Sequence, residues 1–451
     1  ADRYSLSASL RYDGSSKFHP DKRWGAFWSV GAAWRLSEEE FFQSSFLRDY
    51  VNNFKIKGSY GTQGNDAIGG TYALYLDQYT VSNVDGKPGV THAYRGNPDL
   101  TWEKSTNFNV GFESSFLKNR LMVEFDYFIK VTSDMLFNRR LAPSVGVPST
   151  IADNGMEMQN EGVELTLTGV LAKKKNFNWT ASLNLTHYKN TINELEPGKD
   201  PSGYQSGSYW RKVGGSLYDF YMVKYAGVDP QTGNALYYLD VEKTGVVSDA
   251  EGNPILDANG NKQYYNYVET TTTTSGSSAT KYELGKSSLP DVYGGLSTTI
   301  EAFGFDLSIA TAFQVGGYCY DGTYSGLMGS NAGSNFHIDM FKRWQKPGDI
   351  TDVPRLENAN MNMTGGVTND RFLTKSDYFS LKNVQLGYTV PKALLKKFSG
   401  IESLRVYAVG DNLFLGSKRY GLDPRQSLSG ATSNDSYSAM RTVSFGVSVA
   451  F

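Results

Sequence analysis

Aromatic residues gather in two stretches that lie between segments of alternating polar and apolar residues. Tyr204, Tyr209 and Trp210 stand in the first stretch, and Tyr320 and Tyr324 stand in the second. An aromatic ring can stack on a sugar ring or pack against a peptide while its polar edge stays available for hydrogen bonds. The pattern therefore suggests these five residues as contacts for an oligosaccharide or peptide ligand. The alternative is that they pack the loops together, which is the stronger interpretation for any single residue because long loops need small cores too.

Residue types that carry catalysis or bind metals are too few or too scattered for such chemistry. The sequence has no nucleophile elbow, phosphate-binding loop or zinc-protease motif. Cys319 is the only cysteine, which excludes an intrachain disulfide and a tetrahedral thiolate metal site. We expect its thiol to have no function. Four histidines show no ligand spacing: His19, His92, His187 and His337. We expect no catalytic residues, no metal and no cofactor.

The segment Asp257–Asn261 faintly resembles a calcium-binding loop. The closing Glu that such a loop requires is missing from the spacing. A plain turn is the favoured interpretation, because Asp, Asn and Gly are also the ordinary residues of turns.

Composition excludes a strongly charged surface and a membrane-spanning helix. The 451 residues carry 44 Lys and Arg against 46 Asp and Glu, so no net field favours nucleic acid, and Lys173–Lys175 fit a solvated turn. The 30 tyrosines and 47 glycines suit strands and turns. No apolar run reaches the roughly 18 residues of a spanning helix, but a membrane β-barrel would not show one. No signal peptide opens the sequence, so we expect a mature fragment or the second part of a longer protein.

The final eleven residues, Arg441–Phe451, alternate cleanly between two kinds of side chain. Because successive side chains of a strand point to opposite faces, one face would be apolar and the other small and polar. The apolar positions are Val443, Phe445, Val447, Val449 and Phe451, and the small or polar ones are Thr442, Ser444, Gly446, Ser448 and Ala450. A membrane-barrel strand has this pattern, with its apolar face toward lipid and an aromatic residue at the interface. A half-buried strand of a soluble protein would alternate too.

The same alternation recurs along the chain. Segment Arg23–Arg35 has tryptophan at both ends of its apolar face, as two interfacial aromatic girdles would require. In Arg120–Met135, Glu124, Asp126 and Lys130 share the face opposite the apolar one. Charges on that face argue against a packed apolar core and predict a water-filled lumen.

The connections between the predicted strands fall into two classes when strand directions are assigned backward from Phe451. The connections on one side are mostly short: 36–50 (a short helix with Ser37 as its cap), 118–119, 172–175, 301–302 and 391–403. Those on the other side are mostly long: 14–22, 64–101, 136–157, 191–288, 316–377 and 416–439. Outer-membrane barrels have short periplasmic turns and long extracellular loops. We therefore predict an all-β, transmembrane antiparallel barrel segment of about twelve strands spanning residues 1–451, with 191–288, 316–377 and 416–439 as its principal extracellular loops.

Several motifs resemble the SusC/RagA family of TonB-dependent outer-membrane transporters. They span nearly the whole chain in the family's order: Leu10–Phe18, Trp24–Gly31, Asn53–Gly61, Arg343-Trp344, Phe379–Tyr388 and Gly410–Phe414. The resemblance covers only the family's C-terminal part. It implies a barrel of about 22 strands, completed by earlier strands, together with a plug, an N-terminal extension and a TonB-contacting segment that this sequence lacks.

The resemblance also implies partners and a function. A SusD-like lipoprotein would cap the outer loops, the TonB complex would act through the missing N-terminal region, and outer-membrane lipid would surround the wall. The cargo would be a glycan or a peptide, and the family is typical of Bacteroidetes.

Other functions remain open from the residues alone. A passive porin or adhesin barrel would lack the plug and the TonB-contacting segment. A barrel enzyme would need a cluster of acid, base and nucleophile that the sequence does not show. A soluble lectin-like sandwich would be extractable without detergent. Such a fold would not explain why the short connections lie at one end of the strands and the long ones at the other.

Overall fold

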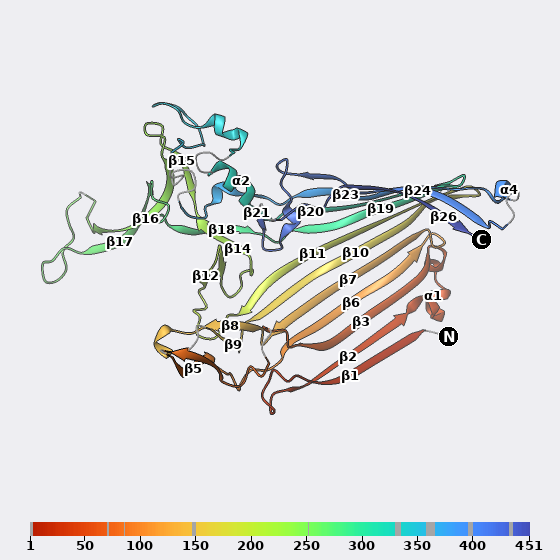
Figure 1. Ribbon diagram of the computed structural model, residues 1–451, viewed down its shortest axis with the longest axis horizontal. Helices are drawn as coiled ribbons and strands as arrows, with labels where there is room; N and C mark the ends of the chain where they lie inside the picture. Colours follow the sequence, from red (N-terminus) through yellow and green to blue (C-terminus); the bar gives the residue numbers. More distant parts are fainter. Residues whose placement is uncertain are drawn as a thin grey trace.

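The computed structural model describes residues 3–69, 72–84, 86–146, 150–250, 252–329, 335–357, 366–395, 400–432 and 436–451. Its dominant element is one sheet of twelve strands, paired antiparallel with their neighbours in chain order (Figure 1). The strands are β1 (Tyr4–Gly14), β2 (Trp24–Arg35), β3 (Val51–Asn65), β6 (Glu103–Phe116), β7 (Leu121–Ser133), β10 (Glu157–Lys174), β11 (Phe177–Glu194), β19 (Val292–Ala302), β20 (Phe305–Val315), β23 (Tyr378–Thr389), β24 (Ser403–Ser417) and β26 (Thr442–Ala450). The predicted set of twelve strands is confirmed.

One face of this sheet is apolar along its whole width. Pairing places Ile300 opposite Leu307, Leu307 opposite Leu386, and Leu386 opposite Ala408, in a row across four strands. Leu386 keeps 50% of its surface exposed, so the row is not the core of a sandwich. Exposed apolar side chains in a continuous band are what a lipid-facing wall requires.

Aromatic residues mark both ends of the apolar face, as predicted. Tyr12 and Trp24 stack at the end where the long loops lie, with ring centroids 5.2 Å apart. Tyr4 and Trp34 stack at the opposite end, where both side chains donate hydrogen bonds to Glu39, over 2.6 and 3.0 Å. An apolar ring with a polar edge suits the boundary between hydrocarbon and water.

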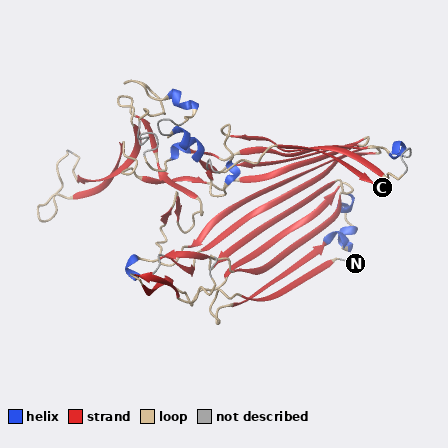
Figure 2. Ribbon diagram, viewed as in Figure 1, coloured by secondary structure: helices blue, strands red, loops and turns tan. Residues whose placement is uncertain are grey.

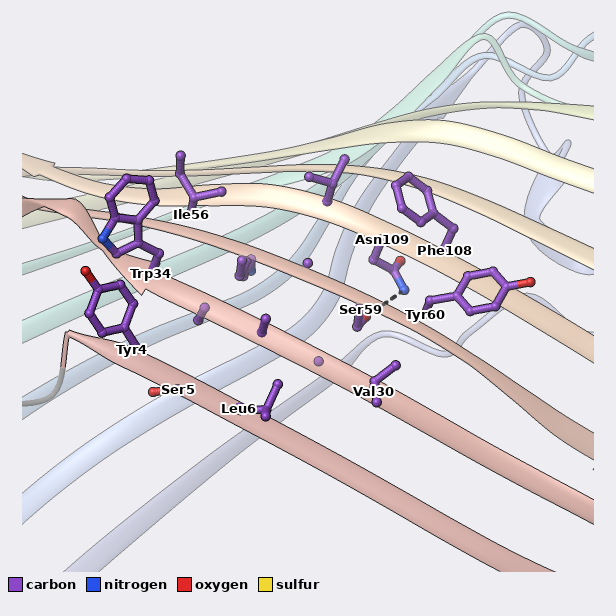
Figure 3. A pocket seen from close by; sticks show the side chains of 16 residues that line it. Tyr4, Ser5, Leu6, Val30, Trp34, Ile56, Ser59, Tyr60, Phe108 and Asn109 are labelled. Atoms are coloured by element: carbon purple, nitrogen blue, oxygen red, sulfur yellow. Dashed lines mark hydrogen bonds between the residues drawn. The ribbon is translucent and has the colours of Figure 1, made fainter.

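The largest apolar depression near β1 and β2 belongs to this outer wall. It occupies about 690 Å³ between the side chains of β1, β2, β3 and β6, among them Leu6, Val30 and Ile56 (Figure 3). Its apolar side chains lie on the lipid-facing side by the strand register. We therefore assign it to contact with lipid rather than to ligand binding.

The opposite face carries a network of charged groups. Lys57 lies 2.6 Å from Glu124 and 3.1 Å from Asp126, and Lys55 lies 3.1 Å from Glu113. These side chains come from β3, β6 and β7, and their residues share one face by strand register. The predicted polar inner face is confirmed here, since paired and partly exposed charges need water around them.

The short connections and both termini lie at the same end of the sheet (Figure 1). The connection between β2 and β3 contains the 3₁₀ helices η1 (Leu36–Glu38) and η2 (Phe46–Asp49) and the helix α1 (Glu40–Gln43), and α4 (Lys392–Leu395) follows β23. The prediction that Ser37 caps the helix is wrong. Ser37 is buried inside η1, and Glu39 precedes α1 without a side-chain cap.

Two predicted turns are shifted along the chain. Strand β10 continues through Lys174, so the turn predicted at 172–175 is made by Lys175 and Asn176. The turn predicted at 301–302 is made by Phe303 and Gly304, which take φ of 53° and 90°. A two-residue hairpin turn of the type that matches strand twist needs positive φ at both positions, and glycine adopts it without strain.

At the other end, the long connections fold into small sheets and helices of their own (Figure 2). Strand β11 runs to Glu194, beyond the predicted start of the 191–288 insertion. The strands here are β4 (Gln78–Val84), β5 (Lys87–Tyr94), β8 (Leu136–Arg140), β9 (Thr150–Asn154), β12 (Tyr204–Ser206), β13 (Tyr209–Arg211), β14 (Asp219–Val223), β15 (Tyr225–Val228), β16 (Ala235–Val246), β17 (Tyr264–Thr273), β18 (Lys281–Ser287), β21 (Tyr318–Asp321), β22 (Leu373–Lys375) and β25 (Ala431–Thr432). The helices are η3 (Pro143–Val145), α2 (Gly322–Met328), η4 (Ile338–Lys342), η5 (Asp370–Phe372) and η6 (Pro424–Gln426).

The buried apolar clusters belong mainly to these loops rather than to the sheet. One cluster joins Phe18, Leu74 and Leu100 to Phe27 and Trp102 near the sheet's end. Another gathers Met328, Met340, Val353 and Phe372 within the stretch between β20 and β23. The loops are thus packed structures with cores, and the sheet supports them.

No helix in the part of the chain that the structure describes is both long and apolar enough to cross a membrane.

Candidate ligand-binding site at the loop end of the sheet

Three long loops meet above the polar face of the sheet. Tyr209, in the insertion between β11 and β19, donates its hydroxyl hydrogen to the carbonyl of Ser429, over 2.6 Å. The backbone N–H of Tyr320 donates to the carbonyl of Gly430 over 2.7 Å, and Thr432 Oγ1 donates to the Tyr320 carbonyl over 3.0 Å. The loop between β24 and β26 therefore ties the other two loops together.

A second contact joins the insertion to the loop between β20 and β23. Trp344 donates its indole N–H to the carbonyl of Pro230 over 2.9 Å. Gly233 has φ of 70°, and a Cβ there would stand 2.4 Å from the Trp344 ring. A residue without a Cβ is needed both for the backbone conformation and for the close approach of the indole. The two loops form one packed unit.

Three of the aromatic residues predicted to contact a ligand, Tyr204, Tyr209 and Trp210, lie on β12 and β13 in the insertion's small sheet. Tyr204 hydrogen-bonds to the Glu196 carboxylate. The Trp210 ring packs on Tyr221 with centroids 4.6 Å apart. Among the residues that the structure describes, the buried indole N–H of Trp210 has no hydrogen-bond partner. Gly203 lies against it, and a Cβ there would stand only 2.4 Å from the indole nitrogen. The rings of Tyr204 and Trp210 are half-buried in loop packing.

The other predicted pair packs in the loop between β20 and β23. The Tyr324 hydroxyl donates to Asp339 over 2.9 Å, and the Arg419 guanidinium lies 3.4 Å from the centre of the Tyr324 ring. The rings of Tyr320 and Tyr324 both pack edge-on against Phe372. These contacts, like those of Tyr204, Tyr209 and Trp210, favour the interpretation that the five residues hold the loops together. Their contact with a ligand stays a prediction.

A cavity that the sequence did not predict lies where these loops meet the sheet. It has a volume of about 360 Å³ and is lined by four tyrosines, Tyr188, Tyr293, Tyr318 and Tyr378, and by four residues of the loop segment 424–430. Pocket sizes of about 300 Å³ and above are typical of small-ligand sites. We call Tyr188, Tyr293, Tyr318 and Tyr378 the tyrosine cluster.

Strand register brings three members of the tyrosine cluster to the same face. Gln314 is paired with Tyr293 on one side and with Tyr378 on the other, and Tyr293 is also paired with Thr186. Tyr188 stands two residues beyond Thr186, so its side chain points to the same side. The rings of Tyr188 and Tyr293 are 6.2 Å apart at 87°. The alternation of side chains in the sequence is enough to assign Tyr188 to the inner face. Its proximity to Tyr293 and Tyr378 can be recognised only when the order of the strands is known.

An ion pair fixes the loop that covers the cavity. Arg425 makes two hydrogen bonds of 2.7 Å to the carboxylate of Asp423 and one of 3.2 Å to Ser380 Oγ. Only 5% of the Asp423 side chain is exposed. Burial by itself raises the pKa of the Asp423 carboxyl, but the hydrogen bonds and charge of Arg425 outweigh it and hold that pKa below its usual range.

Replacing Arg425 is expected to release this loop. In an Arg425→Met variant, Asp423 would be left buried without its cation, at a cost of about 3 kcal/mol in local stability. Limited proteolysis should then cut residues 418–441 faster than in the parent protein, whereas Arg441→Met, at an exposed position, should leave the cleavage rate unchanged. Equal cleavage of the Arg425→Met and parent proteins would contradict the assigned role.

The pair also sets the pH range in which the parent loop stays closed. A carboxyl with a lowered pKa stabilises the folded state above its unfolded pKa, which is about 3.9, and loses that contribution as pH falls through the lower value. The proteolysis rate of the parent loop should therefore be flat near neutral pH and rise only below about pH 4.

Other groups that could do chemistry are already engaged. Asp257 accepts hydrogen bonds from the N–H groups of Asn259 and Asn261, which is the bonding of a plain turn. Cys319 is fully buried, and burial raises the pKa of its thiol to about 12. No group of three or more potential metal ligands occurs among the residues described.

The antiparallel sheet, its apolar outer face with aromatic ends, its polar inner face and its loop-covered cavity define an outer-membrane β-barrel protein. The chain belongs to the TonB-dependent receptor-like β-barrel family, whose model matches residues 1–413. This family is one of receptors rather than of enzymes.

Individual TonB-dependent receptors are similar to this chain in sequence. A TonB-dependent receptor of Formosa agariphila is 29% identical over 94% of this chain and 42% of its own length. The TonB-dependent receptor SusC of Bacteroides thetaiotaomicron is 27% identical over 100% of this chain and 42% of its own. The chain thus spans less than half the length of these relatives. The resemblance to the SusC/RagA family is confirmed.

Solved structures show the same arrangement. The RagAB peptide importer in its closed-closed state matches with a TM-score of 0.82 and 28% identity, over 100% of this chain and 46% of the other. The same importer in its open-open state matches with a TM-score of 0.81 and 26% identity.

Proposed function

We propose that this chain forms the C-terminal wall and the outer loops of a TonB-dependent importer. The cargo is an oligosaccharide or oligopeptide that crosses the outer membrane of a Gram-negative bacterium, and a SusD-like lipoprotein caps the loops. The observation that carries the proposal is the match to the RagAB peptide importer across the whole chain, loops included. In this proposal the 195–291, 316–377 and 418–441 loops face the outside of the cell.

The rest of the barrel and the motor belong to other parts of the protein. Strands β1 and β26 form the two edges of the large sheet in the described residues. Unpaired strand edges are too costly to persist in lipid, so additional strands must close the barrel. The plug and the TonB-contacting segment are assigned to the part of the relatives' length that this chain does not span. The residues here supply the wall and the capture loops.

Energy dependence is the test of this function. Cells that carry the full-length protein and its neighbouring lipoprotein should accumulate one cargo from a panel of labelled neutral hexasaccharides and decapeptides. Deleting TonB or collapsing the proton gradient should remove nearly all of that accumulation, because a plugged barrel does not conduct passively. Accumulation that is equal with and without TonB would replace this proposal with the passive porin alternative.

A further inference from the structure

The four hydroxyl groups of the tyrosine cluster have no hydrogen-bond partner within the described part of the chain. The rings themselves are held: Tyr188 packs on Tyr293, the Lys286 ammonium lies 5.2 Å from the centre of the Tyr318 ring, and Arg425 lies 5.8 Å from that of Tyr378. Fixed rings with free hydroxyls around one cavity are pre-organised for a ligand that offers several hydrogen-bonding groups and apolar faces.

The lining of the cavity is neutral. Its remaining side chains are serines, prolines, one leucine and Gln314. Gln314 donates to Ser376 over 2.9 Å, and Ser288 donates to the carbonyl of Leu428 over 2.7 Å, so both are fixed by the protein. The nearby Arg425 is neutralised by Asp423. Lys286 contacts the Tyr318 ring but is not among the residues that line the cavity. No charged side chain among the described residues belongs to the lining, so a charged ligand there would lose hydration with little compensation.

We propose that this cavity binds neutral sugar rings of an oligosaccharide cargo. A sugar ring presents hydroxyls that both donate and accept, which phenol groups match, and apolar C–H faces that stack on aromatic rings. A volume of about 360 Å³ lies at the small end of ligand pockets, which fits a short stretch of such a chain rather than all of it. The inference rests on the proposed import function and assigns its cargo class and a binding site.

A peptide cargo fits the same lining less well. Peptide termini and many side chains carry charge, and the cavity offers no partner for it. The peptide alternative is retained as an outcome of the test.

The test is isothermal titration calorimetry on the detergent-purified full-length complex. The probes are neutral hexasaccharides built from glucose, mannose or xylose, an acidic galacturonate hexasaccharide and a mixed decapeptide pool. Tyr293→Phe and Tyr378→Phe remove one hydroxyl each and keep the ring, so each should weaken binding of the bound neutral probe about threefold to tenfold. Tyr293→Ala, at a position with 38% exposure, also removes the stacking surface and should weaken binding more than tenfold.

Tyr264→Phe and Tyr264→Ala are the matched controls. Tyr264 lies on β17, is 62% exposed and lies outside the cavity lining, so neither change should alter affinity. Heat-dependent gel mobility of each variant verifies that the barrel is folded.

Each other result overturns the inference. No binding of any neutral hexasaccharide excludes the assigned ligand class, and so does binding of the decapeptides weakened by the same variants. A neutral probe whose affinity is unchanged by all three cavity variants excludes the site. If one of these binding results is found but uptake still depends on TonB, the import function stands without this inference. If the cavity variants weaken binding of a neutral hexasaccharide but uptake does not depend on TonB, only the import function fails.

Discussion

A Leu386→Arg substitution is expected to lower the free energy of unfolding of the barrel by about 2 kcal/mol. Leu386 lies in the row between Leu307 and Ala408 on the apolar face and is 50% exposed there. An arginine that faces lipid costs about 2–4 kcal/mol at the bilayer midplane and about 0–1 kcal/mol near the interfaces. Leu386 lies between these depths, because Tyr388, two residues further on, packs on Phe305 beside the short turn. We therefore expect a cost of about 2 kcal/mol. That is roughly thirtyfold in the ratio of folded to unfolded protein. Urea titration of the full-length protein refolded into lipid vesicles measures the change.

Gln385→Arg is the control for this prediction. Gln385 is the next residue of the same strand, and its side chain lies on the polar face, where Ser308 is its register partner. An arginine there meets water and the carboxylate of Asp306 on the neighbouring strand, so the change in unfolding free energy should stay within about 0.5 kcal/mol. Equal destabilisation by the two variants would show that this face does not contact lipid.

A Gly430→Ala substitution is expected to undock the loop between β24 and β26. Gly430 has φ of 75°, and an added Cβ would stand 2.7 Å from Ser288 Cβ and 2.7 Å from the carbonyl oxygen of Tyr318. Neither contact can be relieved by turning a flexible side chain. Backbone strain of about 1–2 kcal/mol and the overlap together should cost roughly 3 kcal/mol, or about a hundredfold in the ratio of open to docked loop. Hydrogen exchange of the amides of residues 418–432 measures that ratio.

Gly421→Ala separates the overlap from the backbone strain. Gly421 lies in the same loop with φ of 85°, and an added Cβ would have nothing within 4 Å. Its cost is therefore limited to the strain of about 1–2 kcal/mol. Exchange rates that rise equally in the two variants would mean that Gly430 is not packed against Ser288 and Tyr318. Ligand binding in the cavity should fall with Gly430→Ala, because Gly430 also lines it.

The wall of the barrel could be predicted from the sequence because side-chain alternation is a local property of an extended chain. Val443 and Ser444 must point to opposite faces whatever the rest of the protein does. The predicted opposition of Val443, Phe445, Val447 and Val449 to small or polar residues is confirmed in β26, where these side chains remain exposed. Exact turn positions were predicted less well. The turn at Phe303 and Gly304 depends on backbone conformations that a single Phe-Gly pair signals only weakly.

Only the tertiary structure decided which loop residues share a cavity. Tyr188 and Tyr293 become neighbours because β19 pairs with β11 across the whole insertion, and Tyr378 joins them through β20 and β23. The five aromatic residues predicted from the loops, in contrast, pack within the loop cores. Alternation assigns a side chain to a face, but the neighbour across that face depends on strand order and on how distant loops dock. Strand order and loop docking are set by burial and hydrogen bonding between segments far apart in the chain. A local pattern of residues does not encode such contacts.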